Sequence, residues 1–164
     1  MRLTLGSRSY DLTTRSVVVG VGGAPEEMVA QGADLVEIDT EAGAGPAPAP
    51  VFTTACDEGD IGRALSAGAA LVRLTDPSAG GLALCAAAGA AVVVPAGAGG
   101  DAAAAGLPPD RIAVDTLLVD VTGADSPVAA TAAGVIHGAR IVRTTDVRGA
   151  RRVCDVLAAV MEAR

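Results

Sequence analysis

The 164-residue chain contains no lysine, no asparagine and no tryptophan, and it has only one histidine, one phenylalanine and one tyrosine. Without lysine, neither Schiff-base chemistry nor a phosphate-binding P-loop can be built. A single histidine, His137, excludes a metal site held by several imidazoles. These absences remove three large classes of site before any motif is considered.

Positive charge is also scarce. Twelve arginines face 19 acidic residues, which gives a net charge of −7. A phosphate-backbone partner needs clustered basic residues, so we expect no nucleic-acid partner. No apolar run approaches the roughly 20 residues that span a bilayer, and the N-terminus is too short and polar for a signal peptide, so we expect no membrane partner. Three widely spaced cysteines favour reduced thiols in a cytoplasmic protein, for which we expect no metal and no other cofactor.

A helix-turn-strand pattern recurs along the chain. Short β-branched runs follow Gly-Ala turns in the segments 32–40, 68–76, 89–94 and 138–147. Polar residues follow most of these runs. The repeat predicts a single domain over 1–164, with a parallel sheet covered by helices.

The expected elements can be placed in order. Residues 1–15 are expected to form a lead-in or hairpin that closes the bottom of the fold. Strands are expected at 16–21, 34–39, 51–55, 71–75, 91–94, within 111–121 as one long strand or two short ones, and within 138–147. A final helix is expected from Gly149 to Arg164. The Ala/Gly/Pro segment 42–50 is predicted to be a loop, either ordered or a low-complexity linker.

Seven or eight such strands fit either a doubly wound sheet or a (β/α)8 barrel. The barrel is favoured because polar residues recur at the carboxyl ends of nearly every strand, where a barrel gathers them at one mouth: Glu37, Asp39, Thr53, Thr54, Thr75, Asp76, Asp115 and Arg143. About 200 residues is the usual lower limit for that fold. We therefore expect a compact, trimmed (β/α)8 TIM-barrel-like fold that lacks a helix or strand, or that a second subunit completes.

Two motifs have both a functional and a plain structural interpretation. Gly20-x-Gly22-Gly23 imitates a dinucleotide-binding fingerprint, but Pro25 stands at the third glycine position, which favours a tight βα turn. Glu37 and Asp39 share one face of a strand. They could form an acid/base or metal pair, although a solvated rim is the favoured interpretation.

Arg143 lies within a strand that should be buried, so it needs an anionic partner. The candidates are Asp39, Glu41 and Asp115, or a phosphate ligand. Asp115 is expected to point into the mouth or just above it, and His137 is expected on the surface.

The run Gly138-Ala-Arg-Ile-Val-Arg-Thr-Thr-Asp-Val147 resembles the closing strand, GA-x-I-x-R-x-H-D-V, of the dihydropteroate synthases, the pterin-binding TIM-barrel enzymes of folate synthesis. The segment 32–37 resembles their GAD second strand, and Glu41 falls on the glutamate of their GGES motif. The segment 111–115 resembles the strand that ends in their DPG aspartate. The matches occur in the family's order over most of the chain.

The resemblance implies a pterin or phosphate ligand. It implies that Arg143 helps hold the diphosphate of a pterin substrate and that Asp115 hydrogen-bonds the pterin ring. Glu41, Asp39 and Thr145 complete the candidate ligand-binding residues, and Thr145 stands where the family has its histidine. The family's strand-seven lysine and its asparagines cannot be present, and the long first loop is reduced to Gly22-Gly23.

Each such polar contact is worth about 2–4 kcal/mol in a dry site, so losing several should leave negligible rate. We therefore predict a dihydropteroate synthase-like protein without catalytic activity, which acts as a homo-oligomeric binding protein or as the partner of a complete synthase. The alternatives are a residual synthase and a pterin- or phosphate-binding protein that uses Asp115 and Arg143.

Overall fold

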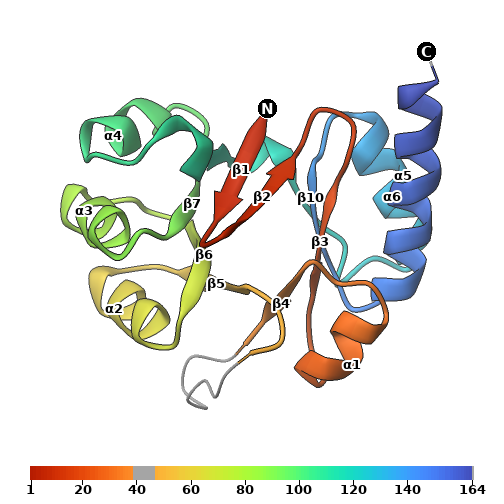
Figure 1. Cartoon of the computed structure of the whole chain (residues 1–164), viewed down its shortest axis with the longest axis horizontal. Helices are drawn as coiled ribbons and strands as arrows, with labels where there is room; N and C mark the ends of the chain where they lie inside the picture. Colours follow the sequence, from red (N-terminus) through yellow and green to blue (C-terminus); the bar gives the residue numbers. More distant parts are fainter. Residues whose placement is uncertain (39–46, 164) are drawn as a thin grey trace.

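A computed structural model describes residues 1–38 and 47–163 (Figure 1). Within these ranges the strands are β1 (Arg2–Leu5), β2 (Arg8–Asp11), β3 (Val17–Gly20), β4 (Leu35–Glu37), β5 (Val51–Ala55), β6 (Ala69–Leu74), β7 (Ala91–Val94), β8 (Ile112–Val114), β9 (Leu118–Asp120) and β10 (Ile141–Thr144). The helices are α1 (Pro25–Ala30), α2 (Glu58–Ser66), α3 (Ala79–Ala88), α4 (Gly99–Ala104), α5 (Pro127–Ile136) and α6 (Val147–Glu162), with 3-10 turns η1 (Pro109–Arg111) and η2 (Asp115–Leu117).

Eight parallel strands form a nearly closed barrel. Their hydrogen-bonded order is β8-β7-β6-β5-β4-β3-β10-β9, and β1 and β2 form a separate antiparallel hairpin. The trimmed barrel expected from the sequence is therefore confirmed, and the doubly wound alternative is wrong, because every strand from β3 to β7 pairs with the next one along the chain. The hairpin expected near the N-terminus is also present.

The trimming is visible between β8 and β9. The run 111–121 divides into two strands joined only by η2, a three-residue 3-10 turn. A complete barrel would carry a helix at this crossover. The two strands that η2 joins are the two ends of the sheet's hydrogen-bonded order. The missing helix therefore lies at the seam of the barrel.

The inside of the barrel is filled by alternate residues of the strands. Val19, Leu35, Phe52, Leu71 and Ile141 are fully buried and pack in one cluster. The hairpin adds three leucines to this cluster, namely Leu3, Leu5 and Leu12. They pack with the first residues of several strands, so the hairpin closes the end of the barrel at which the strands begin, as the sequence predicted.

The outer face of the barrel is covered by two groups of helices. In Figure 1, α2, α3 and α4 lie on one side and α1, α5 and α6 on the other. The first group buries Ile61, Leu82 and Ala102 against β5 to β7. The second group buries Met28, Val135 and Cys154 against β3, β4 and β10. Because small Ala and Val side chains make up much of both clusters, the helices can pack closely on short strands.

Three of the described helices, α2, α3 and α6, begin at a side chain that caps them. Asp57 Oδ1 accepts from the Asp60 amide at the start of α2, and Ser78 Oγ accepts from the Gly81 amide at α3. Both residue types are favoured at this position, because their side-chain oxygens accept from the free amides of the first turn. The last helix begins at Val147, two residues before the predicted start, because Asp146 Oδ1 accepts from the Gly149 amide and caps it there.

A charged contact joins α6 to the start of β4. Arg151 Nη1 donates to Asp34 Oδ2 at 3.0 Å, and the same carboxylate oxygen accepts from the Val18 amide at 2.9 Å. Burial raises the pKa of Asp34, although the Val18 amide and Arg151 act in the opposite direction. Ionised Asp34 therefore carries a desolvation cost that disappears as the pH falls through its raised pKa.

None of the helices in the two described ranges combines the length and hydropathy that a membrane crossing requires.

Phe52 is the largest side chain in the barrel interior and has no exposed surface. We expect Phe52→Ala to lower the free energy of unfolding by about 3–5 kcal/mol, because small neighbours cannot refill the space. Urea unfolding measures this loss. The control Leu84→Ala, at an exposed position of α3, should change stability by less than about 0.5 kcal/mol. A loss below about 1 kcal/mol for Phe52→Ala would contradict the packed interior.

Candidate functional site

Polar side chains occupy the inward face of the strands at their carboxyl ends. Each lies two residues after an inward-facing residue of the core, on the same side of the strand. They are Glu37 after Leu35, Thr54 after Phe52, Arg73 after Leu71, Asp120 after Leu118 and Arg143 after Ile141. Active sites of (β/α)8 barrels lie at this end of the fold. We call this layer the barrel mouth.

Arg143 is the centre of an ion-pair cluster at the mouth. Its Nε donates to Glu37 Oε2 at 2.6 Å and its Nη2 donates to Glu37 Oε1 at 3.0 Å. Its Nη1 donates to Asp120 Oδ2 at 2.6 Å. Every nitrogen of the guanidinium therefore has a carboxylate partner. We call this cluster the Arg143 clamp.

The clamp connects three strands. In the sheet, β3 lies between β10 and β4, and the residue of β3 in register with Arg143 is Val19. Arg143 therefore reaches over an apolar strand to contact Glu37 on β4, while Asp120 approaches from β9 on its other side. A long side chain is needed, because strands two apart are separated by about 9–10 Å.

Electrostatics favour the charged form of every member that shows a shift. The hydrogen bonds from Arg143 to Glu37 raise the pKa of Arg143 and outweigh its desolvation. Burial alone would raise the pKa of Asp120, but hydrogen bonds from the Thr122 hydroxyl and amide and from Arg143 lower it below 3.8. The stabilisation from ionised Asp120 is therefore present at neutral pH and is lost only as the pH falls through this lowered pKa.

The partners of Arg143 differ from those predicted. Asp115 was one candidate, but its Oδ1 accepts from the Ala96 amide at 3.1 Å, and no ion pair joins it to Arg143 in the described residues. Asp115 lies in η2, on the far side of β9 from β10, which explains the difference. Asp39 and Glu41 lie outside the described residues.

The other residues and the glycine motif singled out from the sequence lie outside the Arg143 clamp. Thr145 is exposed, directly after β10. His137 is exposed at the end of α5, as expected, and its Nδ1 lies 2.8 Å from the Ala133 carbonyl oxygen. The Gly20-x-Gly22-Gly23 motif forms a tight βα turn in which Gly22 has a φ of +78°, as the plain interpretation predicted.

Asp120 was missed as a member of the site, and the contact of Glu37 with Arg143 was not predicted. The sequence could have pointed to Asp120 through its spacing, because it follows the inward-facing Leu118 by two residues. The inward face of residues 118–120 could not be assigned, because the run 111–121 fitted either one long strand or two short strands. The sequence favoured a solvated rim for Glu37, with a pair to Asp39 as the alternative, whereas its carboxylate binds Arg143. Among the described residues, no group of three or more metal-binding side chains is present.

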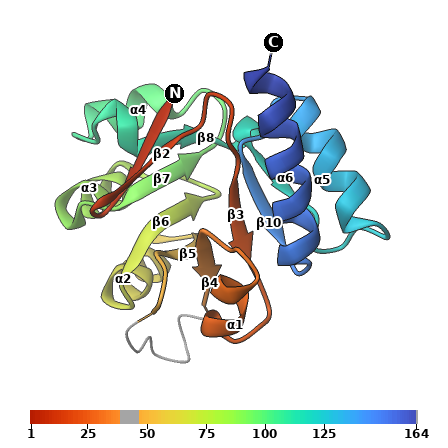
Figure 2. The ribbon, with the colours of Figure 1, turned by 45° about the vertical axis from the view of Figure 1, so that its right-hand side comes forward.

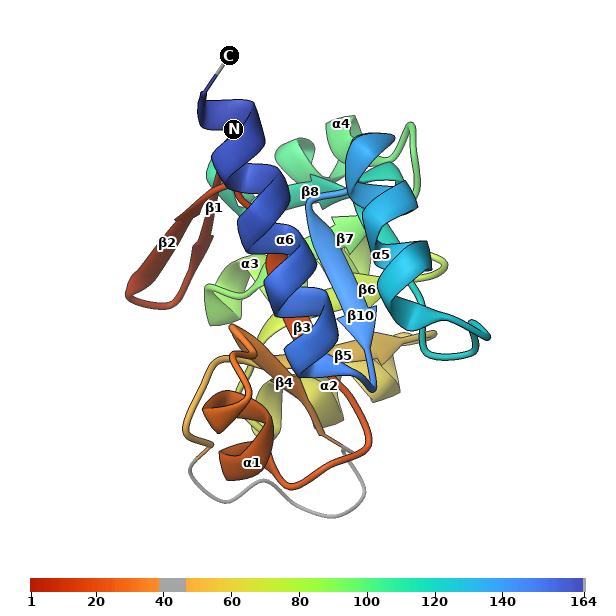
Figure 3. The ribbon, with the colours of Figure 1, turned by 90° about the vertical axis from the view of Figure 1, so that its right-hand side faces the viewer.

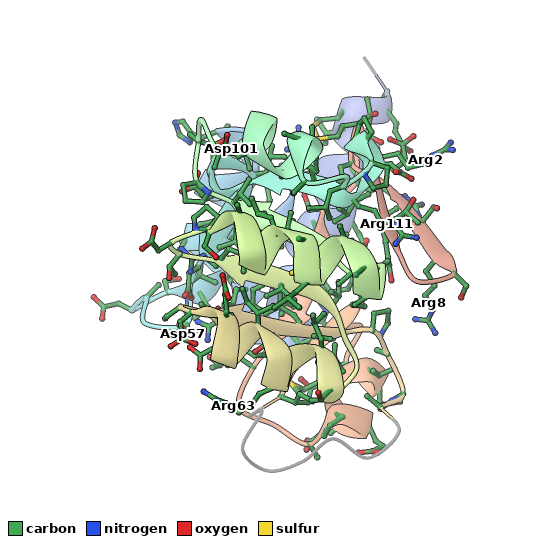
Figure 4. The ribbon with its side chains drawn as sticks, turned by 90° about the vertical axis from the view of Figure 1, so that its left-hand side faces the viewer. Arg2, Arg8, Asp57, Arg63, Asp101 and Arg111 are labelled. Carbon is green, nitrogen blue, oxygen red and sulfur yellow. The ribbon has the colours of Figure 1, made fainter. Side chains whose placement is uncertain are left out.

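Further carboxylates surround the mouth. An open depression of about 570 Å³ beside it is lined by residues that include Asp57, Glu58 and Asp76. Figure 4 shows Asp57 and Asp101 toward the edge of the molecule opposite Arg2, Arg8 and Arg111. Acidic side chains therefore gather where β5 and β6 end, at one side of the mouth.

We expect Arg143→Met to lower the free energy of unfolding by about 2 kcal/mol, because it leaves two partly buried carboxylates without their cation. The control is Arg63→Met, which breaks the exposed Arg63–Asp60 pair of α2 and should cost less than about 0.5 kcal/mol. Urea unfolding of both variants at neutral pH gives the comparison. Equal losses for the two variants would contradict a stabilising clamp.

The fold matches solved structures of one family. No protein-family profile and no curated protein sequence matches the chain. A dihydropteroate synthetase solved with a product has a TM-score of 0.81 and 18% identity, with 100% of this chain and 99% of that chain covered. The Yersinia pestis enzyme with a pterine-sulfa conjugate has a TM-score of 0.73 and 16% identity, with 100% of both chains covered. The Thermus thermophilus enzyme in complex with 4-aminobenzoate has a TM-score of 0.73 and 20% identity, with 98% of this chain and 100% of that chain covered.

The resemblance inferred from the sequence is thus confirmed by the shape of the molecule, although identities of 16–20% carry the fold and not the chemistry. The chain has the fold of the dihydropteroate synthases.

Proposed function

We propose that the protein is a non-catalytic homologue of dihydropteroate synthase that acts as a homo-oligomeric binding protein. The Arg143 clamp is the observation that carries the first part of this proposal. Arg143 matches the arginine that in the synthases helps hold the diphosphate, and here Glu37 and Asp120 already occupy its donors.

The proposed loss of activity has an electrostatic reason. A diphosphate leaving group must be stabilised by cations and hydrogen-bond donors as its bond breaks. A unit charge held 4 Å from a like charge costs about 4 kcal/mol at an effective dielectric constant of 20. Two carboxylates beside Arg143 therefore oppose the ligand that this arginine would otherwise attract.

The residue types that could offset this repulsion of a diphosphate are absent from the chain or replaced. The chain has neither lysine nor asparagine, and Thr145 stands in the place of the family's histidine. Arg73 lies on the inward face of β6, four strands away from β10 in the sheet. One distant arginine does not replace the several hydrogen-bond donors that together must hold a diphosphate.

A second candidate function keeps a ligand without the reaction. The Yersinia pestis structure contains a pterine-sulfa conjugate and the Thermus thermophilus structure contains 4-aminobenzoate, so a pterin is the natural ligand to consider. Asp115 uses only Oδ1 within the described residues, which leaves Oδ2 able to accept from a pterin ring. Pterin binding of this kind uses Asp115, and Arg143 can stay paired with Glu37 and Asp120.

We expect no turnover of pterin methyl diphosphate with p-aminobenzoate, measured as pyrophosphate release with a complete synthase as the positive control. Turnover that Arg143→Met abolishes would contradict the proposal and support a residual synthase. Calorimetry with a phosphate-free pterin separates the second candidate. Saturable heat that Asp115→Asn removes would favour a pterin-binding protein.

The homo-oligomer is supported by an apolar surface on two neighbouring helices. Figures 2 and 3 show α5 and α6 side by side on the outside of the barrel. Four of the exposed large apolar side chains lie on them: Val128, Ile136, Val156 and Val160. Ile136 is 68% exposed and Val156 is 63% exposed. Helix α5 carries no charged residue at all between 127 and 136. We call this surface the α5–α6 face.

Charge along α6 favours a second copy of the chain as the occupant of this face. The first half of the helix carries Arg148 and Arg152, whereas the second half carries Glu162 and Asp155, of which Asp155 is already paired with Arg151 of the same helix. When two copies of α6 pack antiparallel about a two-fold axis, each basic half lies opposite an acidic half. The exposed valines then meet at the centre of the interface, where burial is most favourable.

We expect light scattering during size exclusion to give a mass near twice the 15.9 kDa of one chain, and Val156→Glu to give the monomer mass, because it places a charge in the apolar contact. The control is Leu84→Glu on α3, which should leave the mass unchanged. A monomeric wild type would contradict the homo-oligomer. If that monomer bound a purified complete synthase, the partner would be the synthase.

A cytoplasmic location is part of the proposal. The three cysteines are free: Cys85 and Cys154 are buried, and Cys56 is exposed. Burial raises the pKa of Cys85 to about 11, so this thiol stays protonated and unreactive at neutral pH. These properties are typical of a protein that keeps its thiols reduced.

A further inference from the structure

We propose that Glu37 and Asp120 act as internal anions that exclude oxyanions from the barrel mouth, and that neutralising both creates a phosphate-class binding site at Arg143. The inference builds on the non-catalytic function proposed above. It adds a specific cause for the loss of anion binding, located in two residues that the sequence did not connect with Arg143.

The geometry of Glu37 supports this role. Its two oxygens bind Nε and Nη2 of one guanidinium at 2.6 Å and 3.0 Å. This is the paired arrangement in which arginine binds either a carboxylate or a phosphate. The Glu37 carboxylate therefore occupies the position that two phosphate oxygens would need.

Asp120 closes the remaining side of the arginine. Its Oδ2 accepts from Nη1 at 2.6 Å, and its Oδ1 accepts from the Thr122 amide and hydroxyl at 3.1 Å and 2.7 Å. These bonds hold the aspartate in place, so it cannot turn away without losing them. Any oxyanion would have to displace a carboxylate that Thr122, directly after β9, holds in place.

The charges give the direction of the effect. Glu37 and Asp120 are two anions against one cation, so the ionised clamp has a net charge of −1. With Gln and Asn in their places, the same three positions carry +1. Neutral side-chain amides bind a guanidinium more weakly than carboxylates do, so pyrophosphate can displace them from Arg143 once the repulsion is removed.

The access to the clamp is adequate for a small ion. The side chains of Arg143 and Glu37 are 20% and 18% exposed, and that of Asp120 is 36% exposed. The clamp is thus open to solvent at the mouth, and its charge rather than its burial excludes anions.

The test is calorimetric titration of the full chain with inorganic pyrophosphate at neutral pH and fixed ionic strength. We expect no saturable binding by the wild type. We expect the Glu37→Gln/Asp120→Asn variant to bind at least tenfold more tightly than any binding limit set for the wild type. Adding Arg143→Met to that variant should abolish the binding, because the donors are lost.

A matched control separates the clamp from overall charge. Asp57→Asn/Asp76→Asn changes the net charge by the same amount at the nearby depression, and it should give no binding. Circular dichroism and urea unfolding establish that each variant is folded. A folded clamp variant without binding, an equal gain in the control, or binding that survives Arg143→Met would each overturn the inference.

These outcomes are separate from the proposed function. Synthase turnover by the wild type would refute the non-catalytic proposal whatever the variants bind. Failure of the folded clamp variant to bind pyrophosphate would refute the internal-anion inference and leave the non-catalytic proposal standing.

Discussion

Short strands are the constraint on which the rest of the structure depends. The strands of the barrel have three to six residues, so each contributes at most a few side chains to the interior. These few inward-facing side chains suffice for one apolar layer and one polar layer. The hairpin must therefore provide Leu3, Leu5 and Leu12 as a floor, and the polar layer with the Arg143 clamp stands directly above the core. In so shallow a barrel, any ligand at the mouth meets the clamp at once.

The clamp also meets a physical requirement that this fold places on its mouth. A barrel needs its inward polar residues to be paired, since an isolated charge near the core is costly. In an enzyme, the substrate can supply part of that pairing. Here Glu37 and Asp120 supply it, and the same bonds tie β4, β9 and β10 together. We propose that the contacts which stabilise the mouth are also those that exclude an anionic ligand.

The sequence predicted most of the architecture because its signals were local. Gly-Ala turns and β-branched runs each act within a few residues, and the strands that they predict are present in the fold. The need of Arg143 for an anionic partner was likewise correct. Asp115 was the wrong candidate and Glu37 and Asp120 were not foreseen, because the pairing depends on register across three strands, while Asp39 and Glu41 lie outside the described residues. Glu37 and Arg143 are separated by 106 residues, and no pattern along the chain specifies their contact.

The central claim is that Arg143 of the native protein holds carboxylates and not a phosphate group. A crystal structure of the wild-type protein, determined after soaking in a high concentration of pyrophosphate, tests it directly. The account predicts that Glu37 stays paired with Nε and Nη2 of Arg143, with Asp120 on Nη1. Pyrophosphate within hydrogen-bond distance of this guanidinium, with Glu37 turned away, would contradict it.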